Sequence, residues 1–201
     1  MSGGTPQAGK VRWKRFAALM VPAGLGAAAL IAMTANGSIA ASFAVSGQSF
    51  KVSADQLQGT GFAQYGTLDE TQKGVKHPVA ISVVDHAKLK NLCQSVLIKS
   101  PIGPLTLLVN AGRGATPASA DNMVVDASQL SGNATFKNIE IGRDAGTLNK
   151  VQEKGPSGLF AQQADTVTID GLKQTAWAVN AGTFRLNGLK LNIKPGTHEC
   201  F

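Results

Sequence analysis

The sequence predicts an all-β fold, either a sandwich or a solenoid-like layered sheet, in a single β-rich domain preceded by an N-terminal transmembrane or signal helix. The chain after residue 40 is rich in Gly, Asn, Thr, Ser and Val, and the long periodic Leu/Ala/Glu/Lys stretches of amphipathic helices are missing. An apolar run lies ahead of this region. We therefore divide the chain into residues 1–40, a cytoplasmic basic tail with a membrane anchor or signal segment, and residues 41–201, an extracytoplasmic β domain.

The apolar run covers residues 16–35 and contains no charged side chain. Four cations precede it and keep the N-terminus on the cytoplasmic side, so the segment predicts export of everything that follows. These orientation charges are Lys10, Arg12, Lys14 and Arg15. The residues expected to contact the membrane are Phe16, Leu19, Val21, Leu25, Leu30, Ile31 and Met33.

The fate of this segment decides between an anchored and a secreted protein. About 20 helical residues cross the ~30 Å hydrocarbon layer, whereas cleaved signals have apolar cores of ~7–15 residues, so length favours retention. Pro22 and Gly24 weaken the helix, however, and small residues before Ala40 suit a signal peptidase. Both outcomes stay open: a cell-membrane protein with its domain on the extracytoplasmic face, or a protein secreted after cleavage near Ala40.

The charge balance argues against a nucleic-acid partner. After Ala40 the chain has 15 basic and 12 acidic residues, with no basic run that interleaves aromatic side chains. The partners we expect are membrane lipid, a lipid or wall-polymer ligand, further copies of the chain or a membrane protein.

Two cysteines, Cys93 and Cys200, are an even number in an oxidising compartment, which predicts a disulfide. A disulfide between them would close a loop of more than 100 residues, which stabilises a domain by up to ~4–5 kcal/mol in the chain-entropy model. The competing interpretation is a metal site with His198, but four ligands at a recognisable spacing are missing. We predict no metal and no cofactor.

Short runs of alternating apolar and polar residues predict the strands. They lie at residues 50–55, 81–83, 105–109, 136–141, 166–170 and 183–194. In the last run the alternation shifts by one residue at Asn187-Gly188, which indicates a hairpin or a bulge within one bent strand. The short flanking segments favour the bulge.

Three short motifs resemble one another: Val83-Val84-Asp85, Val124-Val125-Asp126 and Thr168-Ile169-Asp170. They predict either a structural repeat, as in a solenoid, or only the common junction of a strand with a polar turn. Residues 112–120 and 142–158 are irregular by composition and are candidate binding loops.

The chain lacks the Gly-x-Ser-x-Gly pattern of a nucleophile elbow. Its histidines, His77, His86 and His198, are expected on the solvated surface, and no two acids are marked as a catalytic pair. We predict no catalytic residue and favour a non-enzymatic protein. The alternative is a small secreted esterase or lipase acting on lipid esters through an unconventional Ser with His86 or His198.

Calcium is considered because exported β-repeats use it to order turns lined with aspartates. Asp121 and Asp126 are five residues apart, as are Asp165 and Asp170. The EF-hand and glycine-rich nonapeptide patterns are absent, so these four aspartates are better explained as turn-capping residues. The whole chain is 43% apolar but only 5% aromatic, so we expect a core of aliphatic side chains. Such a core can be filled or can leave an open groove for an acyl chain, and we favour the filled core.

The chain resembles a family of actinobacterial cell-envelope proteins of unknown function. The resemblance rests on residues 13–16 (Trp-Lys-Arg-Phe), the Ala/Gly-rich apolar run, residues 41–57, and the two cysteines. Members often carry an automatic cholesterol esterase label, but the family implies no catalytic residues. Our leading hypothesis is an envelope protein whose β domain binds lipid, wall polymer or copies of itself.

Overall fold

The computed structural model describes residues 48–71 and 74–201, and these are all-β, as predicted. The described residues form one compact unit. The strands are β1 (Phe50–Glu70), β2 (Lys76–Lys90), β3 (Leu92–Ser100), β4 (Gly103–Ala111), β5 (Ala118–Lys137), β6 (Glu140–Asp144), β7 (Phe160–Asn180), β8 (Thr183–Arg185) and β9 (Lys190–Pro195), with a 3-10 turn, η1 (Ala145–Thr147). The predicted membrane segment and its orientation charges lie outside the described residues. Within the described part, no helix has the length and apolarity to cross a membrane.

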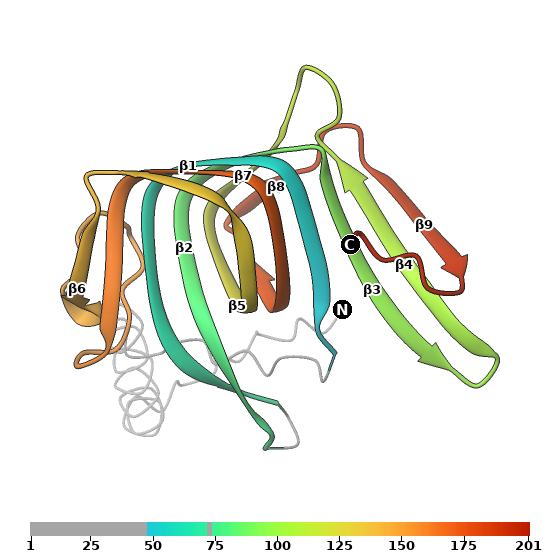
Figure 1. The fold of residues 1–201 in the computed structure, drawn as a ribbon, viewed down its shortest axis with the longest axis horizontal. Helices are drawn as coiled ribbons and strands as arrows, with labels where there is room; N and C mark the ends of the chain where they lie inside the picture. The colour runs from blue at the N-terminus through green and yellow to red at the C-terminus, as the bar shows by residue number, and fades with distance from the viewer. Residues whose placement is uncertain (1–47, 72–73) are drawn as a thin grey trace, which may run out of the picture. The chain divides into compact units, whose positions relative to one another are not determined.

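All nine strands belong to one antiparallel sheet, and four of them close into a ring (Figure 1). β1 pairs with β2 and with β7, β2 pairs with β5, and β5 pairs with β7. β7, which is 21 residues long, pairs with β1, with β5 and, at its first residues, with β6. Closure gives each of these four strands a neighbour on both sides over much of its length. The expected sandwich or layered solenoid is therefore wrong, because a sandwich has two sheets and a solenoid does not close.

The interior of the ring holds the main core. Val84, Val125 and Ile169, the middle residues of the three similar motifs, all point into it. The motifs of β2 and β5 lie side by side but run antiparallel, with Val83 opposite Val124. Successive solenoid units would run in the same direction, so the repeat interpretation is wrong. The motifs resemble one another because each places one aliphatic residue in the same core.

A second, smaller core covers part of the ring's outer surface. Leu148 and Val151 follow η1 and pack against Ala63 and Val83 of the ring. The buried amide of Gln163 fixes this segment by accepting hydrogen bonds from the backbone N–H of Asn149 and Lys150. Much of residues 142–158, predicted to be a candidate binding loop, is thus packed against the ring.

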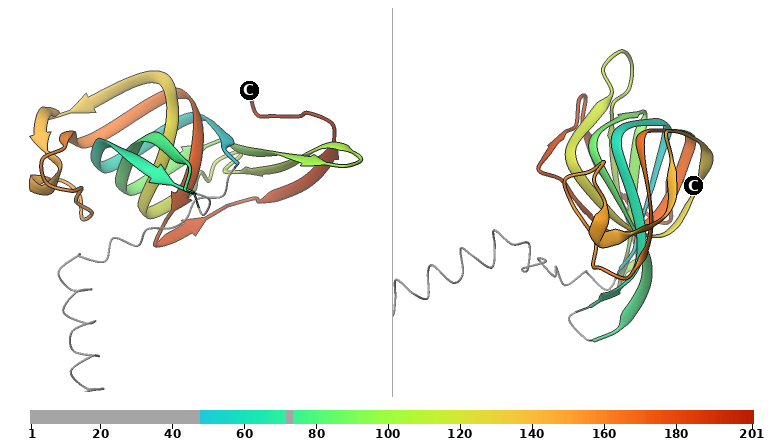
Figure 2. Two further views of the ribbon diagram at one scale, coloured as in Figure 1. Left: turned by 90° about the horizontal axis from the view of Figure 1, so that it is seen from below. Right: turned by 90° about the vertical axis from the view of Figure 1, so that its left-hand side faces the viewer.

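β6 and β8 pair with the ring strands β7 and β5, whereas β3, β4 and β9 extend beyond the ring as a small sheet. β3 pairs with the first residues of β1 and with β4, and β4 pairs with β9. We call β3, β4, β9 and residues 196–201 the arm; it projects to one side of the ring (Figure 2). The other edge of β9 has no strand beside it among the described residues.

Residues 183–194 do not form the single bulged strand that we favoured, nor a hairpin. β8 pairs with β5 in the ring, whereas β9 pairs with β4 in the arm. A turn connects them, in which the N–H of Leu189 donates to the carbonyl of Leu186 and Gly188 has φ +66°. The shift in alternation marks the place where the chain passes from the ring to the arm.

Candidate functional site

The C-terminal residues cross one face of the arm. The predicted disulfide joins Cys93 of β3 to Cys200, with 5.9 Å between the Cα atoms. The backbone N–H of Cys200 donates to Ser95 Oγ at 3.1 Å, and that of His198 donates to Thr106 Oγ1 at 3.0 Å. Ser95 and Thr106 are fully buried beneath this tail. We call this side of the arm the tail face.

A groove of about 490 Å³ lies on the tail face, and basic and amide side chains line much of it. Lys190, Asn192 and Lys194 alternate along β9 and so point to this same side. Arg113 lines the groove and donates a hydrogen bond to Asn110 Oδ1. The groove is therefore a concave, cationic surface.

The net positive charge of the domain is concentrated in and next to the arm. Residues 92–113 and 190–201 carry four basic side chains and one acidic side chain. The rest of the chain after Ala40 carries eleven of each. The whole excess of positive charge in the domain is thus on the arm and on Arg113, which follows β4 directly, and three of these four basic residues line the groove.

The opposite side of the arm, which we call the aliphatic face, carries no charged side chain. The strand register places on it Val96, Ile98, Leu105, Leu107, Val109, Leu191 and Ile193. Leu191 is 59% exposed and Ile193 is 63% exposed, while Ile102 at the β3–β4 turn is 90% exposed. Contiguous apolar surface of this kind marks interaction sites in soluble domains.

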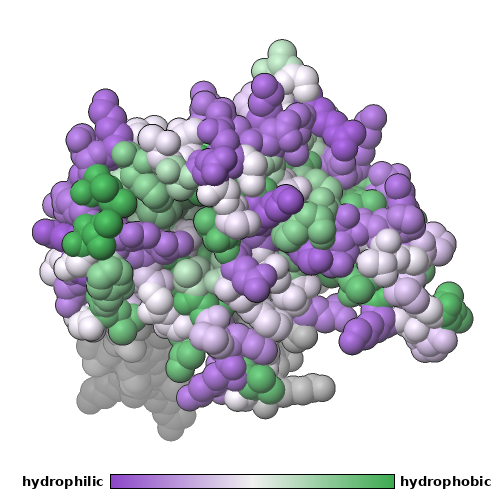
Figure 3. Space-filling view, in the orientation of Figure 1, coloured by the Kyte–Doolittle hydropathy of each residue, from purple (hydrophilic) through white to green (hydrophobic). Residues whose placement is uncertain are grey.

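Hydrophobic side chains also gather over β6, at the left of Figure 3. Ile141 and Phe160 are exposed there, but charged residues are interspersed with them. Glu140 forms ion pairs with Arg143 and with Lys150 across this surface. Only the aliphatic face of the arm combines exposure with the absence of charge over a continuous sheet surface in the described residues.

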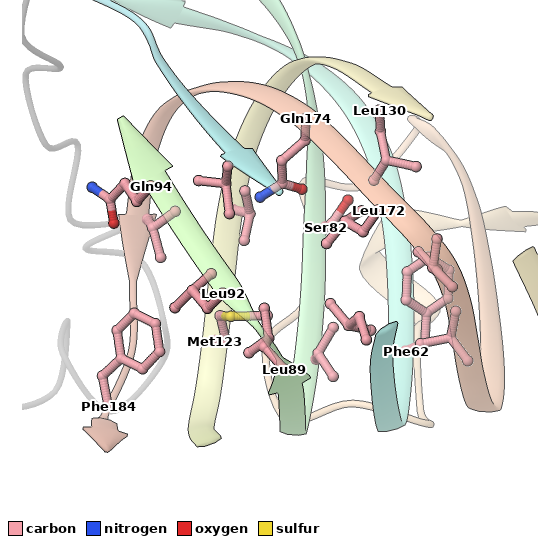
Figure 4. A pocket seen from close by; sticks show the side chains of 17 residues that line it. Phe62, Ser82, Leu89, Leu92, Gln94, Met123, Leu130, Leu172, Gln174 and Phe184 are labelled. Atoms are coloured by element: carbon pink, nitrogen blue, oxygen red, sulfur yellow. The ribbon is translucent and has the colours of Figure 1, made fainter. Parts of the chain in front are cut away.

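The interior of the ring is nearly filled. Its cavity has a volume of about 40 Å³ and is lined mainly by aliphatic residues, with the side chains of Ser82, Gln94 and Gln174 as polar groups (Figure 4). This volume accommodates water molecules but no acyl chain. The preferred expectation of a filled aliphatic core agrees with this geometry.

The three histidines have different environments, and in the described residues none is hydrogen bonded to a serine. His86 Nδ1 lies 3.0 Å from Asp121 Oδ1. The ring of His77 stacks on that of Trp177 with 3.8 Å between centroids. His198 Nε2 lies 3.0 Å from the carbonyl oxygen of Pro195. In the part of the chain that the structure describes, these histidines therefore activate no serine for the esterase alternative.

The four aspartates considered for calcium have unrelated partners. Hydrogen bonds from His86 and then from Arg185 hold the pKa of Asp121 below its usual value. Lys150 lies 2.8 Å from Asp165 and lowers the pKa of that carboxyl. Asp170 accepts a hydrogen bond from Gln56 Nε2 at 2.7 Å. In the residues that the structure describes, no three potential ligands converge on a metal position.

Asp126 has a partner that sequence reasoning missed. Its carboxyl is hydrogen bonded to that of Asp69, and burial, followed by the charge of Asp69, raises the pKa of Asp126 to about 6. Burial also raises the pKa of Asp69. The carboxyls of a glycosidase flank the scissile bond at about 5–9.5 Å from each other, whereas these two are hydrogen bonded to one another, so this pair does not have that geometry. No sequence signal connects the two residues, which only the β1–β2–β5 pairing brings together.

The fold and these surfaces define a class of protein: an all-β domain with a closed ring of strands and an amphipathic sheet arm. The chain belongs to DUF6230, a family of unknown function whose model matches residues 46–201. Neither the curated proteins nor the solved structures give a match to this chain.

Proposed function

We propose that this protein is a non-enzymatic envelope protein whose β domain rests on a lipid surface through the aliphatic face of its arm. The observation that carries the proposal is the exposure of Leu191 and Ile193 on a sheet side without charges, together with the exposure of Ile102 at the β3–β4 turn. Fully burying one such side chain is favourable by about 1.5–3 kcal/mol. Several of them together supply enough free energy for a weak, reversible contact with a bilayer.

The position of the arm in the chain supports a lipid surface as the occupant. Residues 36–49 connect the apolar segment to β1, and fourteen residues reach at most about 50 Å. β1 begins at the root of the arm, where residues Lys51–Ser53 pair with β3. If the apolar segment spans the membrane, this short connection keeps the arm within reach of the bilayer.

Self-association, which was also expected, would use strand addition at a free sheet edge, and this has less support. The free edge of β9 carries Lys190, Lys194 and Pro195. Lysine and proline on an edge strand oppose pairing with another strand, because they add charge and remove a backbone donor. We therefore assign the arm to lipid contact ahead of self-association.

The test places a fluorescent reporter at the tip of the arm. Ile102→Trp is made in the full chain, which is reconstituted into vesicles with and without brominated lipid tails. The matched control is Ile141→Trp, since Ile141 is 66% exposed but lies on β6. The fluorescence added by Ile102→Trp should be quenched by bromine, and that added by Ile141→Trp should not.

Adding Leu191→Ser and Ile193→Ser to the Ile102→Trp chain should abolish the quenching, because the contact depends on the aliphatic face. Quenching that is equal at the two reporter positions would mean that the domain contacts lipid without orientation. If brominated lipid does not quench the tryptophan at position 102, the proposal is wrong.

A further inference from the structure

We propose that the groove on the tail face is a binding site for an extended polyanion, a linear polymer with repeated phosphate or carboxylate groups. The ligand class follows from three properties of the groove: its charge, the spacing of its cations and its rigidity. The site is independent of the lipid contact, because it occupies the opposite side of the arm.

The cations of the groove are available to a ligand. Neither Lys190 nor Lys194 forms an ion pair within the described residues. Glu199, the acidic residue that lines the groove, is already neutralised by Lys51, whose Nζ lies 3.0 Å from its carboxylate. An anion entering the groove thus meets positive charge that no internal carboxylate compensates.

The spacing of the lysines favours a polymer over a small anion. Lys190 and Lys194 are four residues apart on the same side of β9, which corresponds to about 13 Å along the strand. A single phosphate group does not bridge this distance without drawing both side chains together. Asn192 lies between the lysines and supplies an amide donor, so successive anionic groups can each find a partner along β9.

The groove is held in shape before a ligand arrives. The Cys93–Cys200 disulfide fixes the wall that the tail forms, and the hydrogen bonds to Ser95 and Thr106 fix its height above the sheet. The hydrogen bond to Asn110 orients the guanidinium of Arg113. Preorganised donors lose little conformational entropy on binding, which increases affinity.

Titration calorimetry on the full chain in neutral detergent micelles tests the proposal, with linear polyphosphate, poly-glutamate and inorganic phosphate as probes. At least one polymer should bind, inorganic phosphate should bind far more weakly, and the affinity should fall as salt rises. Polyphosphate and poly-glutamate distinguish phosphate from carboxylate as the recognised group. The absence of binding by both polymers would overturn the proposal.

A pair of double variants separates the groove from general electrostatic attraction. Lys190→Gln with Lys194→Gln should weaken polymer binding about tenfold, because two charge-assisted hydrogen bonds are lost. Lys88→Gln with Lys90→Gln removes the same charge from exposed positions on β2 and should change affinity less than about twofold. Equal losses in the two double variants would show that the polymer binds the surface charge without a site. Thermal unfolding of each variant confirms that the comparison is between folded proteins.

Discussion

Cys93 and Cys200 are bonded across 107 positions of the sequence, and this bond ties the end of the chain to the root of the arm. The tail between Gly196 and Cys200 lies over Ser95 and Thr106 as a consequence. One covalent link therefore supports both the stability of the domain and the shape of the cationic groove.

Removing the disulfide by Cys93→Ala with Cys200→Ala should lower the melting temperature by about 10 °C. The cross-link raises the free energy of the unfolded chain by up to ~4–5 kcal/mol, because it restricts its conformations. Each kcal/mol of lost stability lowers the melting temperature of a domain of this size by roughly 2–4 °C. Thermal unfolding followed by circular dichroism measures the effect. The parent chain in reducing agent is the control and should melt close to the double variant. Identical melting of the oxidised parent and the double variant would mean that the link does not restrain unfolding.

The Asp69–Asp126 pair should make the domain less stable as pH rises from about 4 to 7. Burial raises the pKa of Asp126 from 3.8 to about 6, so the folded state retains a proton that the unfolded chain releases. The stabilisation is complete below pH 3.8 and is lost as pH rises through 6. With solvent screening of a partly exposed site, we expect an effect of about 1–2 kcal/mol.

Asp126→Asn tests this linkage because an amide does not titrate and can still donate to Asp69. The variant should lose most of the decline in stability between pH 4 and 7, measured as urea midpoints at several pH values. Asp170→Asn, at an exposed carboxyl bonded to Gln56, is the control and should keep the decline of the parent. If the stability of the parent and of the Asp126→Asn variant depends on pH in the same way, the raised pKa does not belong to Asp126.

The sequence predicted the class of the fold and its covalent link, because both depend on local information. Alternation identified residues 50–55 and 105–109, which lie in β1 and β4. An even cysteine count in a chain that we expect to be exported was enough to predict the Cys93–Cys200 disulfide. Neither inference requires knowledge of which strands are neighbours.

The closed ring and the arm could not be predicted, because they depend on strand pairing. Leu191 and Ile193 alternate with Lys190 and Lys194 in the sequence, so an amphipathic strand was visible in that run. What was missing was the pairing of β9 with β4, which extends this pattern into a sheet with one aliphatic and one cationic side. The Asp69–Asp126 contact was hidden for the same reason.

Gln163 should be one of the polar residues least tolerant of change, because all of its hydrogen-bonding capacity is used inside the protein. Its Nε2 donates to Glu140 and to Asn149 Oδ1, both at 2.8 Å. Gln163→Glu replaces these two donors by a carboxylate oxygen facing two acceptors, one of them charged. We expect a loss of about 2–4 kcal/mol in the free energy of unfolding at neutral pH.

Urea unfolding at pH 7 measures this loss, with Gln162→Glu as the control. Gln162 is the preceding residue of β7, is only half-buried, and donates a single hydrogen bond to Gln64. That substitution should cost less than about 1 kcal/mol. Comparable losses in the two variants would indicate that the buried amide of Gln163 has no special role.

Gly112 should be required for the passage from β4 to β5, since it has no room for a side chain. Its φ is +67°, and a Cβ atom would lie 2.4 Å from the backbone nitrogen of Ala118 and 2.6 Å from the carbonyl oxygen of Leu89. Both obstacles are backbone atoms, so relief of the clash requires movement of the β2–β5 junction.

Gly114→Ala is the matched control, because Gly114 has φ +88° but open space around it. It isolates the conformational strain of about 1–2 kcal/mol from the steric clash. Gly112→Ala should therefore lower the melting temperature by several degrees more than Gly114→Ala, and equal shifts in thermal unfolding would show that the junction accommodates the added methyl group.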